Sequence, residues 1–215
     1  MADPKRITSL LLKKYPHPKI ALNFTNPLEL LIATILSARC TDARVNEVTK
    51  DLFKKYRSDR DYGKADLRSL EKEIKSTGFF KNKAKMLRDC CATIANDFKG
   101  KVPETLEELT ALPGVGRKTA NIILGSAFGH QAIAVDTHVL RVSNRLGIAH
   151  SNKPERVEDE LVQQIPLKKQ TVFHLALILH GRETCTARGP KCLKCVLYDE
   201  CEWEEKTPKN PDLKP

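Results

Sequence analysis

Four of the seven cysteines are concentrated near the end of the chain. They are Cys185, Cys192, Cys195 and Cys201, with the spacing C-x6-C-x2-C-x5-C. Sets of four thiolates bind either zinc or an iron-sulfur cluster, and zinc ribbons usually bring two C-x2-C pairs where this chain has one. The spacing therefore predicts a metal site and leaves the choice between zinc and iron open. No ligand spacing joins Cys40, Cys90 and Cys91 to this set, so we expect them to be ordinary helix residues.

A lysine and an aspartate have side chains suited to covalent catalysis. Lys118 lies at the start of a predicted helix, and a lysine in its free-amine form can attack an electrophilic carbon. Asp136 lies at the entrance to a later helix, where a carboxylate could stabilise positive charge that develops on a sugar. Both positions also have simpler interpretations, because a surface lysine can contact a phosphate and an aspartate can cap its helix.

The segment LTALPGVGRKTAN predicts a tight turn between two helices. Pro113 ends the first helix, and Gly114 and Gly116 lack the side chains that would keep a ligand away from backbone N–H groups. At the start of the second helix these groups and the helix dipole favour a phosphate, or a bound cation that bridges to one. A plain corner between helices would use proline and glycine for the same backbone reasons. Arg117 and Lys118, which follow the turn in a basic chain, favour phosphate binding.

The elements that must position these residues are helical, because apolar residues recur with helical periodicity between the proline and glycine positions. Helices are predicted over residues 28–37, 45–56, 67–76, 84–98, 105–112, 157–165 and 171–181. Asn26 and Pro27 are a typical N-cap and first-turn proline for the first of these, which is apolar on several faces and should be central and buried. A further helix begins at Asp136 and is closed by Gly147. The predicted fold class is therefore all-α.

A turn at Gly78, Phe79 and Phe80 interrupts the helical pattern and is followed by the basic stretch 81–85. Exposed aromatic side chains beside lysines suit contact with nucleic acid. A buried aromatic anchor of the turn explains the same residues equally well.

The chain carries a formal net charge of +10 at pH 7 and has a pI near 9.3. Such a surface attracts polyanions, so nucleic acid is the leading partner, although a basic protein without such a partner would have the same charge.

The first residues contain an apolar run of only three leucines, Leu10 to Leu12, which is too short for a signal peptide or a membrane span. We expect no membrane contact and a cytoplasmic location, where the cysteines stay reduced and favour metal binding or catalysis over disulfides.

The segment LPGVGRKTAN followed by IAVDTH resembles the hairpin and catalytic-aspartate signature of the endonuclease III family of bifunctional DNA glycosylases, which belongs to the helix-hairpin-helix superfamily. The resemblance extends from about Pro16 to Cys201 and includes the cysteine spacing. It implies base excision DNA repair, in which an N-glycosylase removes oxidised pyrimidines and a lyase cleaves the strand by β-elimination. The implied partner is double-stranded DNA that contains damaged bases or abasic sites. We expect a monomer that associates with the nucleoid.

The resemblance assigns chemistry to the residues singled out above. Lys118 is implied as the nucleophile that displaces the base and forms a Schiff base with the sugar. Asp136 is implied as the essential acid of the same reaction. At the four cysteines, the resemblance points to a 4Fe-4S cluster rather than zinc.

Two parts of the chain are implied to hold the DNA backbone. One is the hairpin at Gly114, Val115 and Gly116. The other is the loop between the first two cysteines, which would present the positive charges of Arg188 and Lys191 to the phosphates.

Two further residues are implied to enter the DNA itself. Phe79 occupies the position of an apolar wedge that unstacks the opposite strand. Arg39 stands where the family often has a glutamine that fills the gap left by the flipped base. Arginine can fill this space and pair with a base edge or a phosphate, but differently, so the preferred lesion and opposite base stay open.

The resemblance also implies two domains. Residues 21–130 would form a six-helix domain with the hairpin. Residues 1–20 and 131–215 would form a discontinuous iron-sulfur cluster domain. The polar, proline-rich ending KTPKNPDLKP is expected to be unstructured.

Overall fold

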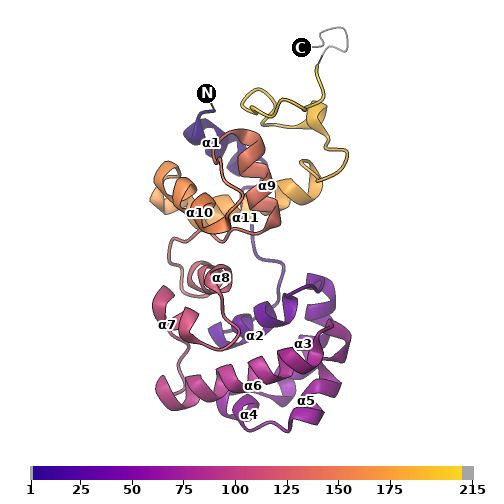
Figure 1. Ribbon diagram of the computed structural model, residues 1–215, viewed down its shortest axis with the longest axis vertical. Helices are drawn as coiled ribbons and strands as arrows, with labels where there is room; N and C mark the ends of the chain where they lie inside the picture. The colour runs from indigo at the N-terminus through magenta and orange to yellow at the C-terminus, as the bar shows by residue number, and fades with distance from the viewer. Residues whose placement is uncertain (1, 210–215) are drawn as a thin grey trace. The chain divides into compact units, whose positions relative to one another are not determined.

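The computed structural model describes residues 2–209. Within these residues every regular element is helical and none is a strand, which confirms the predicted all-α class. The chain divides into two compact units, Ile20–His130 and Met1–Lys19 with Gln131–Pro215 (Figure 1). In the described part of the chain, no helix is long and apolar enough to cross a membrane. Most of the ending predicted to be unstructured lies outside the described residues.

The unit Ile20–His130 is built around one buried helix. Its elements are α2 (Pro27–Ser37), α3 (Asp42–Lys55), α4 (Asp59–Gly63), α5 (Leu67–Glu73), the 3-10 turn η1 (Lys75–Thr77), α6 (Phe80–Asp97), α7 (Leu106–Ala111) and α8 (Arg117–Ala127). Residues 30–36 of α2 are all buried, and this helix contacts α3, α6 and α8. As predicted, the Asn26 side chain accepts a hydrogen bond from the N–H of Glu29, and Pro27 occupies the first turn. The apolar surface on several faces of α2 therefore makes it the core of this unit.

Some helix boundaries in this unit differ from the prediction. The helix α6 begins at Phe80 rather than at residue 84, because Gly78 and Phe79 have left-handed φ angles of 71° and 48° and turn the chain immediately before it. The short helix α4 was not predicted, although Ser58 and Asp61 form a capping box at its start.

The other unit joins the N-terminal helix to the C-terminal half of the chain. Its helices are α1 (Pro4–Lys14), α9 (Thr137–Leu146), α10 (Pro154–Gln164) and α11 (Gln170–Glu183). Ile7 and Leu11 of α1 are fully buried in one core with Val139 of α9 and Phe173 of α11. The helix α1, which the side chain of Asp3 caps, was not predicted from the sequence. Burial of its apolar face against α11 fixes the N-terminal segment in this unit.

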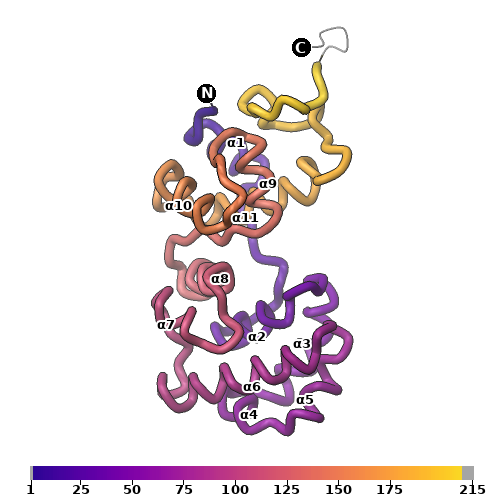
Figure 2. The backbone as a smooth tube through the Cα atoms, in the orientation of Figure 1, coloured from indigo at the N-terminus to yellow at the C-terminus, as the bar shows by residue number. Residues whose placement is uncertain are grey.

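After α11 the chain forms a succession of turns that contains all four clustered cysteines (Figure 2, yellow). Its one regular element among the described residues is the 3-10 turn η3 (Cys192–Lys194). Little apolar side chain is buried here, so hydrogen bonds and contacts to α9 and α11 must hold the segment in place.

Candidate functional site

The turn between α7 and α8 has two glycines with different requirements. Gly114 has a φ of +80°, and a Cβ at this position would lie 3.0 Å from the Cβ of Met86 in α6, so only glycine fits. Gly116 is the N-cap of α8, and no atom lies within 4 Å of the place that a Cβ would take. The space in front of the N-terminus of α8 is therefore open, as phosphate binding requires.

Val115 lies between these glycines but faces inward. Its side chain is 6% exposed, and its N–H donates to the carbonyl of Leu112 at 3.1 Å. The valine therefore stabilises the turn. A ligand would meet the backbone of the two exposed glycines rather than the Val115 side chain.

Lys118 lies in the first turn of α8, where its side chain is exposed. Arg117 next to it is exposed as well. The positive end of the helix dipole and these two side chains produce a local positive potential at the open side of the turn. This region can attract an anion and leaves the Lys118 amine accessible.

Asp136 is the N-cap of α9 in the other unit. Its Oδ1 accepts hydrogen bonds from the N–H groups of His138 and Val139, both at 2.8 Å. The buried residues Ile133 to Val135 precede it, and α9 follows it, so the half-buried carboxylate has little freedom to move. Both capping bonds use Oδ1, which makes Oδ2 the oxygen suited to another partner.

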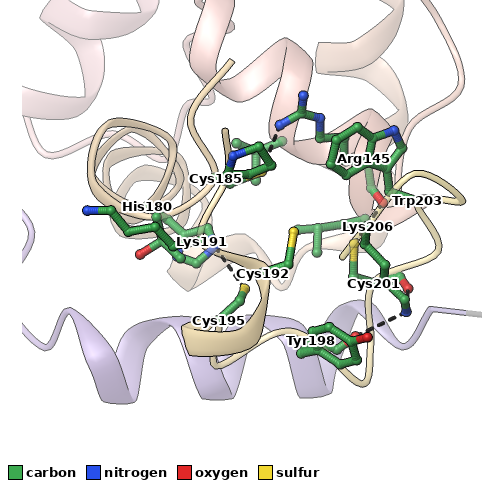
Figure 3. Close-up of a pocket in the computed structure, with 14 residues that line it drawn as sticks. Arg145, His180, Cys185, Lys191, Cys192, Cys195, Tyr198, Cys201, Trp203 and Lys206 are labelled. Carbon is green, nitrogen blue, oxygen red and sulfur yellow. Dashed lines mark hydrogen bonds between the residues drawn. The ribbon is translucent and has the colours of Figure 1, made fainter. Parts of the chain in front are cut away.

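The four clustered cysteines line a single pocket of about 380 Å³, a volume that includes open solvent (Figure 3). Other residues on its wall are Arg145, His180, Tyr198, Trp203 and Lys206. Among the described residues, no three Cys, His, Asp or Glu side chains are placed to hold a single metal ion. Four cysteine side chains around one pocket are a donor set that suits zinc or an iron-sulfur cluster.

Arg145 of α9 connects the first of these cysteines to the following loop. Its guanidinium donates to Sγ of Cys185 at 3.4 Å and to the carbonyls of Thr186 at 2.8 Å and Ala187 at 3.3 Å. It also lies 3.8 Å from the ring centroid of Trp203. A cation held this close offsets the negative charge that four thiolates would place in the pocket.

Arg141 lies one turn earlier on α9 and reaches the end of α11. Its guanidinium donates to the carbonyl of Cys185 at 3.2 and 3.1 Å and to that of Gly181 at 3.0 Å. A Cβ at Gly181 would lie 3.0 Å from the Cβ of His138, so glycine permits this close approach of α11 to α9. Arg141 and Arg145 together hold the segment that carries Cys185 against the helix that Asp136 caps.

A buried histidine adjoins Cys195. Burial lowers the pKa of His180 to about 4, and its Nε2 lies 3.4 Å from Sγ of Cys195. Burial also raises the pKa of the Cys195 thiol to about 11. A neutral histidine can donate to a thiolate, and a positively charged metal centre would supply the charge that the buried thiolate lacks. By contrast, Cys90 and Cys91 are buried helix residues of α6, as predicted, whereas Cys40 lies in the turn between α2 and α3 and not in a helix.

The loop between Cys185 and Cys192 presents its basic residues to solvent. Arg188 and Lys191 are both exposed. The loop is closed by the N–H of Lys191, which donates to the carbonyl of Thr184 at 2.9 Å, and by the Thr186 hydroxyl, which donates to the carbonyl of Arg188 at 3.0 Å. Its charges are thus exposed on a hydrogen-bonded turn.

Arg39 and Phe79 lie together in the unit Ile20–His130. The guanidinium carbon of Arg39 is 5.3 Å from the centroid of the Phe79 ring, and Phe79 is 59% exposed. An aromatic residue so exposed is not a buried anchor of its turn. The pair forms an apolar and cationic projection beside the start of α6.

The predicted site residues divide between the two units. Gly114, Val115, Gly116, Lys118, Arg39 and Phe79 belong to Ile20–His130, and Asp136, the four cysteines, Arg188 and Lys191 belong to the other unit. Sequence reasoning missed Arg141, Arg145 and His180. The arginines are four residues apart on the helix that Asp136 opens, and this spacing, which places both side chains on one face, was the available signal.

Comparison with known proteins gives a consistent result over most of the chain. Residues 32–167 match the family described as HhH-GPD superfamily base excision DNA repair protein. The chain is 46% identical over 206 residues to endonuclease III of Synechocystis sp., with 94% of both chains covered. It is 42% identical over 208 residues to endonuclease III of Escherichia coli, with 96% of this chain and 99% of the other covered. Among solved structures, a trapped endonuclease III–DNA covalent intermediate, an estranged-adenine complex, matches with a TM-score of 0.89 and 44% identity, covering 94% of this chain and 97% of that one.

Proposed function

The chain belongs to the endonuclease III family within the HhH-GPD superfamily of base excision DNA repair proteins, and we propose that it removes oxidised pyrimidines from double-stranded DNA and cleaves the strand at the resulting abasic site. It is a DNA glycosylase and an abasic-site lyase. The observation that carries the proposal is the exposed amine of Lys118 in the first turn of α8, directly after the open glycine turn. A protein that only bound DNA would need the turn but not a nucleophile beside it.

The reaction begins when the damaged nucleotide leaves the base stack. The Lys118 amine bonds to C1′ of the sugar, the C1′–N bond breaks, and the base departs with the electron pair and takes up a proton. The sugar ring opens to a Schiff base. Loss of a proton from C2′ then expels the 3′ phosphate as the C3′–O bond breaks, and water releases Lys118.

Asp136 serves as the essential acidic residue of this reaction, acting through its carboxylate. Its Oδ1 is held by two backbone N–H groups, so the carboxylate has a fixed direction. Oδ2 stabilises the positive charge that develops on the sugar and helps to remove the proton from the lysine amine. Capping and catalysis use different oxygens and are therefore compatible.

DNA is held at its backbone by the turn at Gly114 and Gly116 and by Arg188 and Lys191 of the loop after Cys185. The formal charge of +10 supports this partner. Arg39 and Phe79 enter the duplex beside the flipped base. The active species is a monomer.

The cofactor is a 4Fe-4S cluster held by Cys185, Cys192, Cys195 and Cys201. Their placement around one pocket and the cations Arg145 and Lys206 on its wall support a metal centre with thiolate ligands, and membership of the endonuclease III family favours the cluster over zinc. The cluster stabilises the loop that carries Arg188 and Lys191, and base removal requires no electrons from it. Iron and sulfide in the purified protein are expected, and a colourless protein with stoichiometric zinc would contradict this assignment.

A panel of duplexes tests the activity and the substrate class together. One strand carries an oxidised, an alkylated or an ultraviolet-damaged base, and free base and strand breaks are measured separately. We expect free base and a β-elimination end with oxidised pyrimidines. Binding without either product would indicate a DNA-binding protein without catalysis, and release of alkylated or photodamaged bases alone would refute the substrate class.

A further inference from the structure

Lys83 is a lysine with almost no contact with solvent. It lies in the first part of α6, within the basic stretch 81–85, yet it is only 3% exposed while Lys81 and Lys85 are exposed. Burial of an ammonium group is costly unless hydrogen bonds replace water. Lys83 Nζ has such bonds, because it donates to the carbonyl of Leu36 at 2.7 Å and to that of Thr77 at 2.8 Å.

These two carbonyls belong to segments that are far apart in the sequence. Leu36 lies in the last turn of α2, where neighbouring carbonyls accept from the chain itself, as Ile35 does from the N–H of Ala38. Thr77 ends the 3-10 turn η1. A cation is favoured at a helix C-terminus, where carbonyls lack helical partners. Lys83 therefore joins the end of α2 to the end of η1 through a single buried atom.

Each of these segments leads directly to a residue of the projecting pair. Arg39 follows α2 and has a φ of 55°, and Phe79 follows η1 and has a φ of 48°. Left-handed backbone at a residue other than glycine costs free energy and persists only where the surrounding structure imposes it. Their side chains meet, with the guanidinium 5.3 Å from the ring centroid.

Two opposing effects act on the pKa of Lys83 in this position. Burial lowers the pKa of Lys83, and the thiol of Cys40, beside Arg39, opposes this effect. Packing alone would be satisfied by an apolar side chain of the same length. The feature that requires a lysine is its ability to donate to two carbonyls at once.

We propose that Lys83 is a positioning residue that holds Arg39 and Phe79 as one preformed wedge for insertion into the DNA duplex. This inference rests on the proposed function, in which the pair enters the duplex beside the flipped base. Lys83 acts through the backbone of the two segments and does not touch DNA. Without the two hydrogen bonds of Lys83, the positions of Arg39 and Phe79 are no longer linked. The arrangement of the two side chains that insertion requires must then form during binding, which lowers the affinity.

The test compares Lys83→Met, which keeps the length of the side chain and removes the donor, with Lys72→Met on α5 as an exposed lysine control. Two substrates separate an effect on the wedge from an effect on catalysis. One is a duplex with an oxidised pyrimidine, and the other is single-stranded DNA with an abasic site, which has no opposite strand to unstack. We expect kcat/KM of Lys83→Met to fall roughly ten- to hundredfold on the duplex. Lyase activity on the single strand should stay within about twofold of the unmodified enzyme. Equal losses on both substrates, or no loss on either, would overturn the inference.

A binding measurement decides the inference independently of catalysis. A fluorescent adenine analogue opposite the lesion brightens when it is unstacked, and Lys83→Met should reduce this signal at saturating protein. If the unmodified protein brightens the analogue but releases no base, the proposed function fails and the comparison of Lys83→Met still stands. In a Phe79→Ala background, Lys83→Met should add no further loss on the duplex, and additive losses would contradict action through the wedge. Lys83→Gln, which retains one donor group, replaces the methionine variant if the latter does not fold.

Discussion

The guanidinium of Arg145 lies 3.4 Å from Sγ of Cys185 and 3.8 Å from the centre of the Trp203 ring. In the proposed cluster site this arginine is an outer partner of one ligand, and it also supports the loop that carries Arg188. We expect the Arg145→Met protein to lose its iron about tenfold faster than the unmodified protein, in air or in the presence of a chelator. Loss of an outer partner of a ligand weakens metal retention by about this factor. Visible absorbance and iron content measure the loss. Arg57→Met, a change at an exposed arginine of the other unit, is the control, and equal rates in both variants would contradict the role of Arg145.

The two glycines of the turn should respond differently to an added side chain. Gly114→Ala should lower the free energy of unfolding by about 1–3 kcal/mol, because its φ is +80° and its Cβ would meet Met86. Gly116→Ser should leave stability nearly unchanged, since serine is a favoured N-cap and the space is open. Its Cβ would nevertheless occupy the approach to α8, so DNA affinity should fall and depend less steeply on salt. Undiminished DNA affinity of a folded Gly116→Ser protein would exclude phosphate binding at this turn.

Features whose signal lies within one helical turn could be predicted from the sequence. Local signals gave the caps at Asn26 and Asp136, because a capping residue and its N–H partners lie within one turn of the chain. The unpredicted helix α1 has the same kind of signal in Asp3, and only its pairing with α11 requires tertiary structure.

Lys83 illustrates the opposite case. In the sequence it is one of three lysines in a basic stretch, and nothing local distinguishes it from Lys81 or Lys85. Its burial depends on carbonyls of Leu36 and Thr77, which the fold brings to it. Contacts of this kind, like those of Arg145 with the cysteine loop, connect segments whose proximity the local pattern does not encode.

Arg39 should influence the choice of the base opposite the lesion. A guanidinium only donates hydrogen bonds and suits the two acceptors of guanine, whereas an amide such as glutamine also accepts and suits adenine. We therefore expect Arg39→Gln to shift the ratio of kcat/KM values for opposite guanine and opposite adenine toward adenine. A shift of about fivefold corresponds to the lower end of the energy of such a contact, about 1 kcal/mol. An unchanged ratio would mean that Arg39 fills space without reading the base.

His174 should make the unit that contains Asp136 sensitive to acid. Burial lowers the pKa of this histidine from 6.5 to about 4, against a weaker opposite effect of the Asp136 charge. Between these two pH values the unfolded chain binds a proton at this histidine and the folded chain does not. The contribution of neutral His174 to the free energy of unfolding is therefore fully present above pH 6.5 and is lost as the pH decreases toward 4. His174→Leu should reduce the slope of unfolding free energy against pH in this window, as measured by urea unfolding. Parallel slopes in the two proteins would show that His174 is not the group responsible.

The proposed mechanism requires a Schiff base at Lys118, which borohydride reduces to a stable covalent bond between protein and DNA. The protein is incubated with duplex DNA containing an oxidised pyrimidine, borohydride is added, and the covalent complex is quantified on a denaturing gel. We expect a stable complex with the unmodified protein and none with Lys118→Gln, while Lys168→Gln, at an exposed lysine of the other unit, should trap normally. A covalent complex that persists in Lys118→Gln would exclude Lys118 as the nucleophile.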